Sequence, residues 1–420
     1  GSVLTSRLTA QSGLISAVIA GTDFVKSGAG ELILSGTNVY TGATTVNGGT
    51  LTVQYAGAIP ADSEVRVLGG IFNLASATLT NHFVVAGGEL TGGTVNLDQL
   101  TATTGAISAN IEGDLGFTKD SAGVLTLGGF NSFTGGVNIT AGTLQLASAT
   151  AVGGNAVTVA GGTLNLGQQV IANGVTLNSG AITNGTLALS QLTANAGTVA
   201  ADLTGTGGFN RDGAGVLTLA GANTFTGGVT VTSGTLVAGS VGAFGANVVT
   251  VNGGVLDLGQ QAVANSFTLN GGALVNGTLA LGKVTANAGT LGAKLTGTTG
   301  FTKTGNGVLT LSGANTYTGG TTVNAGTLTA GSATAFSTGA VTIAGGFLDL
   351  GGQTIANNVT IAGGELTGGA INAGQVTLAS GSISATLTGS GTLTKSGTGT
   401  FTLESANTYA GGTNLSGGKL

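Results

Sequence analysis

Apolar and polar residues alternate along most of the chain in stretches of only three or four residues. Within a stretch, Val, Leu or Ile stands two positions from the next apolar residue, with Thr, Asn or Asp between them. A period of two is the signature of a β-strand with one buried face. Seven stretches of one part of the chain show it: Val308–Leu311, residues 321–324, Val341–Ile343, residues 347–350, Val359–Ile361, residues 371–373 and residues 376–378.

Glycine-bearing pairs separate these stretches and indicate tight turns. Gly-Gly, Ala-Gly and Asn-Gly recur between them, and glycine adopts the positive φ angles that such turns require. The chain has a single proline, Pro60, so nearly every backbone N–H can join a strand ladder. The pattern therefore predicts an all-β protein made of many short strands.

The same sequence returns at an interval of about 92 residues, which is the mark of a repeat protein. The central asparagines are 93, 92, 92 and 92 residues apart: Asn38, Asn131, Asn223, Asn315 and Asn407. Two further sets keep the step: Asn81, Asn173, Asn265 and Asn357, and glycine pairs that begin at Gly69, Gly161, Gly253 and Gly345. The repeats cover residues 1–23 (partial), 24–116, 117–208, 209–300, 301–392 and 393–420 (partial). Units of such constant length are expected to stack.

Strand spacing predicts how they stack. A strand with its turn takes about seven residues, so a coil of three strands needs about 20 residues and one repeat holds four or five coils. We expect residues 1–420 to form a single continuous β-solenoid, a parallel β-helix of about twenty coils on the order of 100 Å long, with a core of stacked Val, Leu and Ile. A transmembrane β-barrel also alternates polarity, but aromatic residues are 4% of the chain and long loops are missing from it, unlike a barrel.

The amino-acid composition limits the classes of function and partner that the chain can have. Charged residues are 6% of the chain and the net charge is −5, which gives no electrostatic case for a nucleic-acid partner. No apolar run approaches the ~18 residues of a spanning helix. Cysteine is absent, which excludes disulfides and thiolate metal sites. The chain opens without a signal peptide and both ends interrupt a repeat, so we expect it to be a fragment of a longer protein.

A longer motif lies in every repeat: Lys-x-Gly-x-Gly-x-Leu-Thr-Leu-x-Gly-x-Asn-x-Tyr/Phe-Thr-Gly-Gly-x-Thr-Val-x-x-Gly-Thr-Leu. It occupies residues 26–51, 119–144, 211–236, 303–328 and 395–420, with mild departures such as Arg211 for lysine and Ala410 for threonine. This motif resembles the autotransporter-associated β-strand repeat, also called the passenger-associated transport repeat. Because the sequence between the motifs repeats too, the resemblance spans the whole chain.

The resemblance implies a right-handed parallel β-helix in a secreted passenger at the surface of a Gram-negative bacterium. It also implies a secretory signal and a C-terminal outer-membrane barrel in the full-length protein. Members of this family are associated with passenger export and folding, with adhesins and with some toxins.

Residues suited to catalysis are few and scattered. His82 is the one histidine, and the other copies have Gly174, Ser266 and Asn358 at its position. No partner for Ser-His-Asp or metal chemistry can be named, so we interpret His82 as a solvent-facing turn residue. Asp257 and Asp349 share a repeat position about 20 Å apart, too far for the ~5–9.5 Å of a glycosidase pair. The pairs Asp62/Glu64 and Glu112/Asp114 are closer, and we interpret Asp62/Glu64 as part of a solvated loop in the irregular stretch 55–66.

Three repeat columns remain as candidate sites. The basic column is Lys26, Lys119, Arg211, Lys303 and Lys395. Its members could face a polyanionic surface, but a spacing of about 20 Å exceeds the ~10 Å Debye length, so we favour protection of strand edges or solubility. The asparagine column, Asn38, Asn131, Asn223, Asn315 and Asn407, is expected to cap a turn by bonding its own backbone. The aromatic column, Tyr40, Phe133, Phe225, Tyr317 and Tyr409, is expected to pack over the adjacent bend, with an exposed platform for sugars as the alternative.

These observations together predict a structural protein. No catalytic, cofactor-binding or metal-binding residue can be assigned, so we expect no enzymatic activity and no cofactor. We predict a stalk or spacer segment of a secreted bacterial surface adhesin or autotransporter passenger. A module that binds host or bacterial glycans or associates with itself is the alternative, as is the passenger segment of a toxin.

Overall fold

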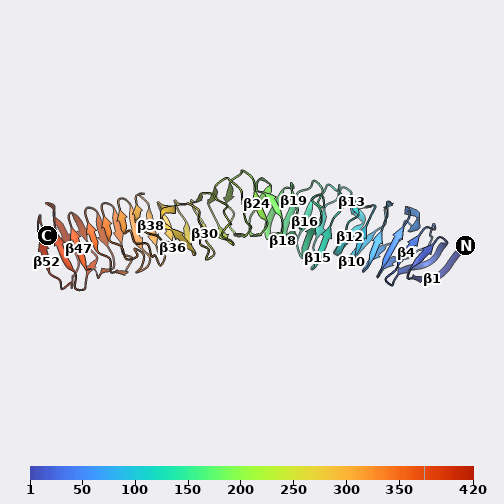
Figure 1. Cartoon of the computed structure of the whole chain (residues 1–420), viewed down its shortest axis with the longest axis horizontal. Helices are drawn as coiled ribbons and strands as arrows, with labels where there is room; N and C mark the ends of the chain where they lie inside the picture. The colour runs from blue at the N-terminus through green and yellow to red at the C-terminus, as the bar shows by residue number, and fades with distance from the viewer. Residues whose placement is uncertain (373) are drawn as a thin grey trace. The chain divides into compact units, whose positions relative to one another are not determined.

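The chain forms two compact units, Gly1–Thr204 and Gly205–Leu420. In the computed structural model, which describes residues 1–372 and 374–420, each unit is a stack of short strands (Figure 1). Ala373, the last residue of the expected strand 371–373, lies outside the described residues. The expectation of an all-β parallel solenoid is confirmed, while the continuity of one solenoid over residues 1–420 stays a prediction.

The first unit is built from strands β1 to β24. They are β1 (Ser2–Ala10), β2 (Gly13–Ile15), β3 (Val18–Lys26), β4 (Glu31–Leu34), β5 (Thr44–Val46), β6 (Thr50–Val53), β7 (Val65–Val67), β8 (Ile71–Asn73), β9 (Thr78–Leu79), β10 (Phe83–Thr91), β11 (Thr94–Asn96), β12 (Leu100–Ile107), β13 (Asn110–Glu112), β14 (Phe117–Lys119), β15 (Val124–Leu127), β16 (Val137–Ile139), β17 (Thr143–Leu146), β18 (Val157–Asn165), β19 (Val170–Ile171), β20 (Val175–Thr183), β21 (Thr186–Ala188), β22 (Leu192–Ala194), β23 (Gly197–Val199) and β24 (Asp202–Thr204).

The described residues of the second unit hold strands β25 to β52. They are β25 (Phe209–Arg211), β26 (Val216–Leu219), β27 (Val229–Val231), β28 (Thr235–Ala238), β29 (Val249–Val251), β30 (Val255–Asp257), β31 (Phe267–Leu269), β32 (Ala273–Val275), β33 (Thr278–Ala280), β34 (Val284–Ala286), β35 (Gly289–Leu291), β36 (Lys294–Thr296), β37 (Phe301–Lys303), β38 (Val308–Leu311), β39 (Thr321–Val323), β40 (Thr327–Ala330), β41 (Val341–Ile343), β42 (Phe347–Asp349), β43 (Thr354–Ile355), β44 (Val359–Ile361), β45 (Glu365–Thr367), β46 (Ala370–Ile371), β47 (Gln375–Leu378), β48 (Gly381–Ile383), β49 (Thr386–Leu387), β50 (Thr392–Lys395), β51 (Phe401–Leu403) and β52 (Thr413–Leu415).

Helical structure among the described residues is limited to four single turns of 3₁₀ helix: η1 (Ala56–Ala58), η2 (Leu97–Gln99), η3 (Leu189–Gln191) and η4 (Leu281–Lys283). None of the helices in residues 1–372 and 374–420 has the length and apolar character needed to cross a membrane.

Parallel ladders form the faces of each stack. In the second unit one face is β37-β39-β41-β44-β47-β50-β52, and another is β38-β40-β42-β45-β48-β51. A third, shorter face is β43-β46-β49. Each strand therefore bonds to strands one coil before and one coil after it, which is how a parallel sheet is built from a single winding chain.

The register divides each repeat into five coils of unequal length. Along the first face the fourth repeat pairs Phe301 with Thr321, Thr321 with Val341, Val341 with Val359, Val359 with Val376 and Val376 with Leu393. The first two steps are the longest and the last two are the shortest. Because Leu393 is the equivalent of Phe301 in the next repeat, these five steps complete one repeat. The expected four or five coils per repeat are thus five.

The first repeat differs from the others in a single coil. Its step along the first face runs from Thr44 to Val65, whereas the equivalent step of the second repeat runs from Val137 to Val157 and is one residue shorter. This difference places the extra residue of the first repeat between Thr44 and Val65, where the irregular stretch 55–66 lies. The insertion is thus accommodated in a loop and leaves the strand register intact.

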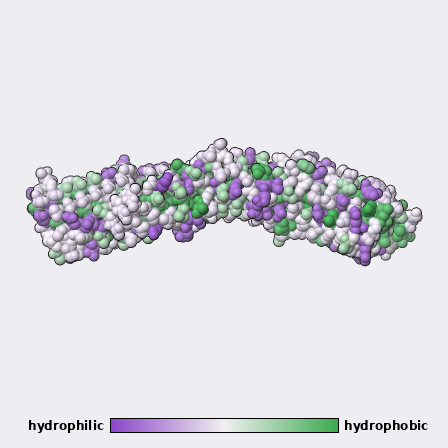
Figure 2. Space-filling model, viewed as in Figure 1, coloured by the Kyte–Doolittle hydropathy of each residue, from purple (hydrophilic) through white to green (hydrophobic). Residues whose placement is uncertain are grey.

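Stacked apolar side chains fill the interior, as expected. On the second face Leu309, Leu328, Leu348, Leu366 and Ile383 follow one another in register, and all are fully buried. Burial of each such side chain contributes about 1.5–3 kcal/mol. The outward-pointing residues of this face include Thr310, Thr329 and Thr367, together with the exposed Val308 and Phe347. The side of the molecule seen in Figure 2 is largely pale, with scattered polar and apolar residues.

One glycine of the motif makes close coil contact possible. Gly49, Gly142, Gly234, Gly326 and Gly418 all have φ between +62° and +71°. A Cβ on Gly326 would lie 2.3 Å from the carbonyl oxygen of Gly305 and 2.7 Å from that of Gly307, both in the preceding coil. Only glycine combines that φ with that approach.

We predict that Gly326→Ala lowers the free energy of unfolding by about 2 kcal/mol or more, because left-handed backbone strain adds to the clash. The matched control is Gly282→Ala, where a Cβ would meet no atom within 4 Å and the change should stay within about 0.5 kcal/mol. Urea unfolding followed by circular dichroism measures both. Equal effects of the two substitutions would contradict the prediction.

Candidate functional site

The basic column lies inside the stacks rather than on their surface. Lys26, Lys119, Arg211, Lys303 and Lys395 are all fully buried. Each is the last residue of its strand, namely β3, β14, β25, β37 and β50. The expected roles in edge protection or solubility are therefore wrong, as is attraction of a polyanionic surface, because each requires a cation in contact with solvent.

Lys26 shows how a charge is accommodated there. Its Nζ donates to the carbonyl oxygens of Ser27 (2.9 Å), Gly28 (2.8 Å) and Gly48 (2.8 Å), which uses all three ammonium donors. The first two carbonyls belong to the turn that follows Lys26, and the third lies in the next coil. Burial lowers the pKa of Lys26, as expected for a cation removed from water. Backbone carbonyls here replace a carboxylate partner and join the turn to the next coil.

The other lysines of the column use the same turn. Lys119 and Lys303 donate to the carbonyl oxygens two residues further on, those of Ser121 and Gly305, and burial lowers the pKa of both lysines. Lys395 donates to four carbonyl oxygens, those of Ala379, Ser396, Gly397 and Gly417. None of the five cations in this column forms an ion pair with a carboxylate of the described residues.

Arg211 fits this turn less completely than lysine does. Its Nη2 donates to the Gly215 carbonyl and its Nε to that of Thr235 (3.3 Å). Its Nη1 is buried without a hydrogen-bond partner, the one such side-chain atom among the described residues. A guanidinium has five N–H donors, more than a turn shaped around an ammonium satisfies.

The asparagine column bridges three coils. Asn315 Oδ1 accepts a hydrogen bond from the Leu295 amide of the preceding coil (2.9 Å), and its Nδ2 donates to the Ala335 carbonyl of the following coil (2.7 Å). Asn38 does the same with Ile19 (2.9 Å) and Ala58 (2.7 Å). The expectation of a cap on its own turn is thus corrected. A bond to a nearby carbonyl adds to the bridge at Asn131. At Asn407 the Nδ2 group donates to the nearby Ser405 carbonyl, while Oδ1 accepts from the Leu387 amide of the preceding coil.

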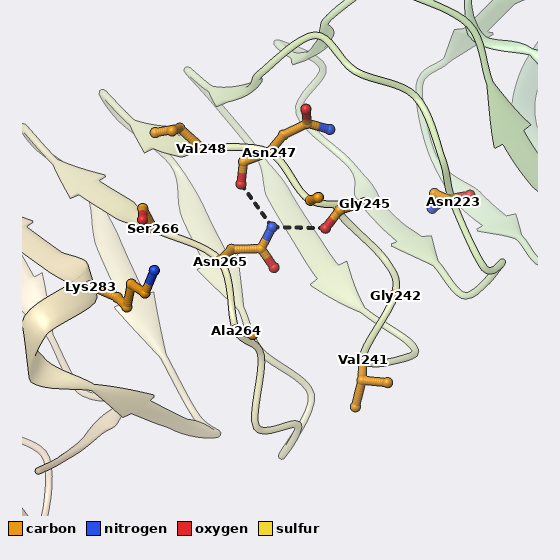
Figure 3. A pocket seen from close by; sticks show the side chains of 11 residues that line it. Asn223, Val241, Gly242, Gly245, Asn247, Val248, Ala264, Asn265, Ser266 and Lys283 are labelled. Atoms are coloured by element: carbon orange, nitrogen blue, oxygen red, sulfur yellow. Dashed lines mark hydrogen bonds between the residues drawn. The ribbon is translucent and has the colours of Figure 1, made fainter.

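A second set of asparagines holds the loop of the second coil. Asn81, Asn173, Asn265 and Asn357 each donate from Nδ2 to two or three carbonyls of that loop. Asn265 binds the carbonyls of Gly245 (3.0 Å) and Asn247 (2.8 Å), as Figure 3 shows. No hydrogen bond to Asn265 Oδ1 is formed within the described part of the chain.

The aromatic column is part of the core. Tyr40, Phe133, Phe225 and Tyr317 are buried, and Tyr409 is half-buried. Tyr40 stacks on Phe24 with ring centroids 6.0 Å apart. The exposed platform for sugars is therefore wrong at the four buried positions.

A polar pair accompanies each tyrosine of this column. The hydroxyls of Tyr40, Tyr317 and Tyr409 bond those of Thr44 (2.5 Å), Thr321 (2.6 Å) and Thr413 (2.7 Å). Where the column has phenylalanine, the residue four positions later is valine, Val137 or Val229. Both hydroxyls are thus present or absent together. Burial raises the pKa of Tyr40 and Tyr317 to about 12, against the opposing effect of the threonine hydrogen bonds.

His82 has a neighbour at each ring nitrogen, contrary to the expectation that no partner can be named: its Nε2 lies 3.4 Å from Thr101 Oγ1. His82 is exposed, as expected, and its Nδ1 lies 3.2 Å from Glu64 Oε1, while Glu64 also pairs with Arg66. Burial alone would raise the pKa of Glu64, but the Arg66 hydrogen bond and charge, with a contribution from His82, lower it. Asp257 and Asp349 accept from Gly259 and Gly351 of their own turns (both 2.8 Å). No group of three or more His, Cys, Asp or Glu suited to a metal occurs in residues 1–372 and 374–420.

An open hollow lies beside the asparagines in the third repeat (Figure 3). It has a volume of about 370 Å³, and residues of four successive coils line it, among them Asn223, Val241, Val248, Asn265 and Lys283. A hollow of about 320 Å³ in the first repeat includes the equivalent Ala56 and Asn81. The sequence interpretation missed this feature, because the strand pattern does not show where the connecting loops leave open space.

The Tyr–Thr pair was also missed, and its signal was present in the repeats themselves. We predict that Tyr317→Phe and Thr321→Val each destabilise the protein by about 1–2 kcal/mol, because each leaves a buried hydroxyl without its partner. The double variant, which reproduces the Phe133/Val137 pair, should lose clearly less than the sum. A double-mutant cycle in urea measures a coupling of about 1 kcal/mol or more, and strict additivity would contradict the pairing.

Comparison with known proteins agrees with this structure. The family model described as passenger-associated-transport-repeat matches residues 24–53, 117–146, 209–238, 301–330 and 393–420. The adhesin BmaC autotransporter of Brucella suis biovar 1 (strain 1330) is 34% identical over 433 aligned residues, which cover 94% of this chain and 12% of the adhesin. No solved structure matches the chain. The resemblance inferred from the motif is thus confirmed: the chain carries five passenger-associated transport repeats and is similar over nearly its whole length to a segment of an autotransporter adhesin.

Proposed function

We propose that this chain is a non-catalytic structural segment of a secreted passenger on the surface of a Gram-negative bacterium. Its stacked coils would set the reach of an adhesive protein. The proposal includes one continuous solenoid over residues 1–420, and a full-length protein that ends in an outer-membrane barrel.

The buried position of the repeated polar residues is the main support for a structural role. In the repeat motif the lysines, asparagines and tyrosines are the residues best suited to chemistry, yet nearly all are buried and bonded to the backbone or to threonine. Such groups are removed from any ligand, and their hydrogen bonds join successive coils. Each copy of the motif therefore forms the same hydrogen-bonded contact between neighbouring coils. A motif that maintains contacts within the stack supports a structural role.

The relative supports the location. Its name identifies it as both an adhesin and an autotransporter, and the repeats that this chain matches belong to the passenger-associated transport repeat family. The expected location at the cell surface agrees with both. The chain spans only 12% of the length of that adhesin. A role of this chain in adhesion is therefore part of what we propose.

Removing one repeat tests the structural role. Deletion of residues 301–392 takes out five coils and joins Gly300 to Leu393, the register equivalent of Phe301. The product should keep its far-UV circular dichroism per residue and become shorter by about 24 Å, five coils at ~4.8 Å each.

Small-angle X-ray scattering measures the change in maximum dimension. Deletion of residues 301–350, which removes no whole number of repeats, is the matched control and should disrupt the stack. Loss of β-structure after deletion of the whole repeat, or an unchanged length, would contradict the proposal.

A further inference from the structure

The first face of the second unit carries a uniform column of outward residues. This face consists of two parallel ladders, β25-β27-β29-β31-β34 and β37-β39-β41-β44-β47-β50-β52. In the first unit the same column varies and includes Val25, Arg66, Val84 and Asn138, so strand formation alone does not require uniformity. From β27 to β50 of the second unit the outward residue is threonine in every strand: Thr230, Thr250, Thr268, Thr285, Thr302, Thr322, Thr342, Thr360, Thr377 and Thr394.

The residues beside this column are small and almost free of charge. Those two positions before and after each threonine share its side of the sheet, and together with the ten threonines we call them the threonine face. Lys283 is the one charged residue among these twenty neighbours; the others are Gly, Ala, Ser, Thr, Asn, Gln and a single Val. The second face of the same unit differs, because it carries Asp257, Asp349 and the exposed Phe347.

Side chains of the threonine face are ordered along the stack. Within each ladder the threonines stand in register from one coil to the next. Beside them, Asn270 Nδ2 donates to Asn252 Oδ1 (2.9 Å) and Asn287 Nδ2 donates to Asn270 Oδ1 (2.7 Å). Identical side chains stacked in register, with asparagine ladders among them, are the arrangement through which two sheets interdigitate in a dry interface.

The charge of the second unit does not oppose contact between two copies. Residues 205–420 include six cationic and five acidic side chains, a net formal charge of +1. Three of the cations, Arg211, Lys303 and Lys395, are buried. Two such units therefore repel each other little at long range.

The size of the threonine face suits a weak dimer. Ten coils at ~4.8 Å and a width of four residues at ~3.3 Å give a face of roughly 43 Å by 13 Å. Two copies in contact would cover about 1,100 Å² together, which is at the low end for a specific interface.

We propose that the threonine face pairs with the threonine face of a second copy of this chain. The threonine methyl groups supply apolar contact, and small neighbours such as Gly320, Ala340 and Ala344 let the two sheets approach closely. Because both copies use the same surface, a two-fold axis closes the contact and the product is a dimer. The face has no aromatic ring on which a sugar could stack, which favours a protein partner. This inference goes beyond the proposed structural role, and the repeat-deletion test of that role does not depend on it.

Sedimentation velocity of the full 420-residue chain over a range of concentrations tests the pairing. We expect a monomer–dimer equilibrium with a Kd in the micromolar range. Thr342→Lys places two ammonium groups in each dimer interface, one from each copy, and should weaken dimerisation tenfold or more. The matched control is Thr329→Lys, which adds the same charge at an outward position of the second face and should leave dimerisation unchanged.

Two further arms make the result independent of one variant. Thr377→Lys, also on the threonine face, should weaken dimerisation as Thr342→Lys does, and far-UV circular dichroism checks that all three variants keep the parent fold. Dimerisation of the parent chain should persist from about 50 mM to about 500 mM salt, because no ion pair holds the faces together. Four results would overturn the proposal: a chain that stays monomeric at about 100 μM, dimerisation unchanged by both Thr342→Lys and Thr377→Lys, equal weakening by Thr329→Lys, or dissociation of the dimer by salt.

Discussion

Buried polar side chains that bond across coils are the interaction on which the rest of this solenoid depends. A column of leucine and isoleucine stabilises a stack but distinguishes poorly between one coil and the next, because every coil offers a similar apolar face. Asn315 instead has one amide to accept from and one carbonyl to donate to, in the two adjacent coils. Leaving either group unpaired inside the stack is costly. These bonds therefore specify which coil lies against which.

This constraint explains why the sequence repeat is longer than the coil. The coils shorten along the repeat, from the step between Phe301 and Thr321 to the step between Val376 and Leu393, so the five coils are not interchangeable. The motif with its lysine, asparagine and aromatic residues occupies the long coils, where the turn around the ammonium and the loop beyond it need extra residues. The shorter coils follow, and the hollow bordered by Val241 is lined by residues of both long and shorter coils.

Much of the fold could be predicted from the sequence, because strand period and repeat interval are written directly in it. The roles of the polar columns could not, and the reasons differ. The sequence interpretation assigns Lys303 to the surface because charged side chains are usually exposed to solvent. However, Phe301 lies two residues earlier and points to the core, and a strand period of two places both residues on the same face. Its compensation by turn carbonyls is visible only in three dimensions. The partners of Asn315 lie 20 residues away in each direction, so sequence reasoning limited to neighbouring residues assigned it a local cap.

Native-state hydrogen exchange of the Asn315→Ala variant tests the coupling between coils most directly, with exposed Asn306→Ala as the control. If the asparagine bridge joins three coils, amide protection should fall both around Leu295 and around Ala335, in the preceding and following coils, while Asn306→Ala changes neither. Protection lost only in the turn around residue 315, with both neighbouring coils as protected as before, would contradict the account.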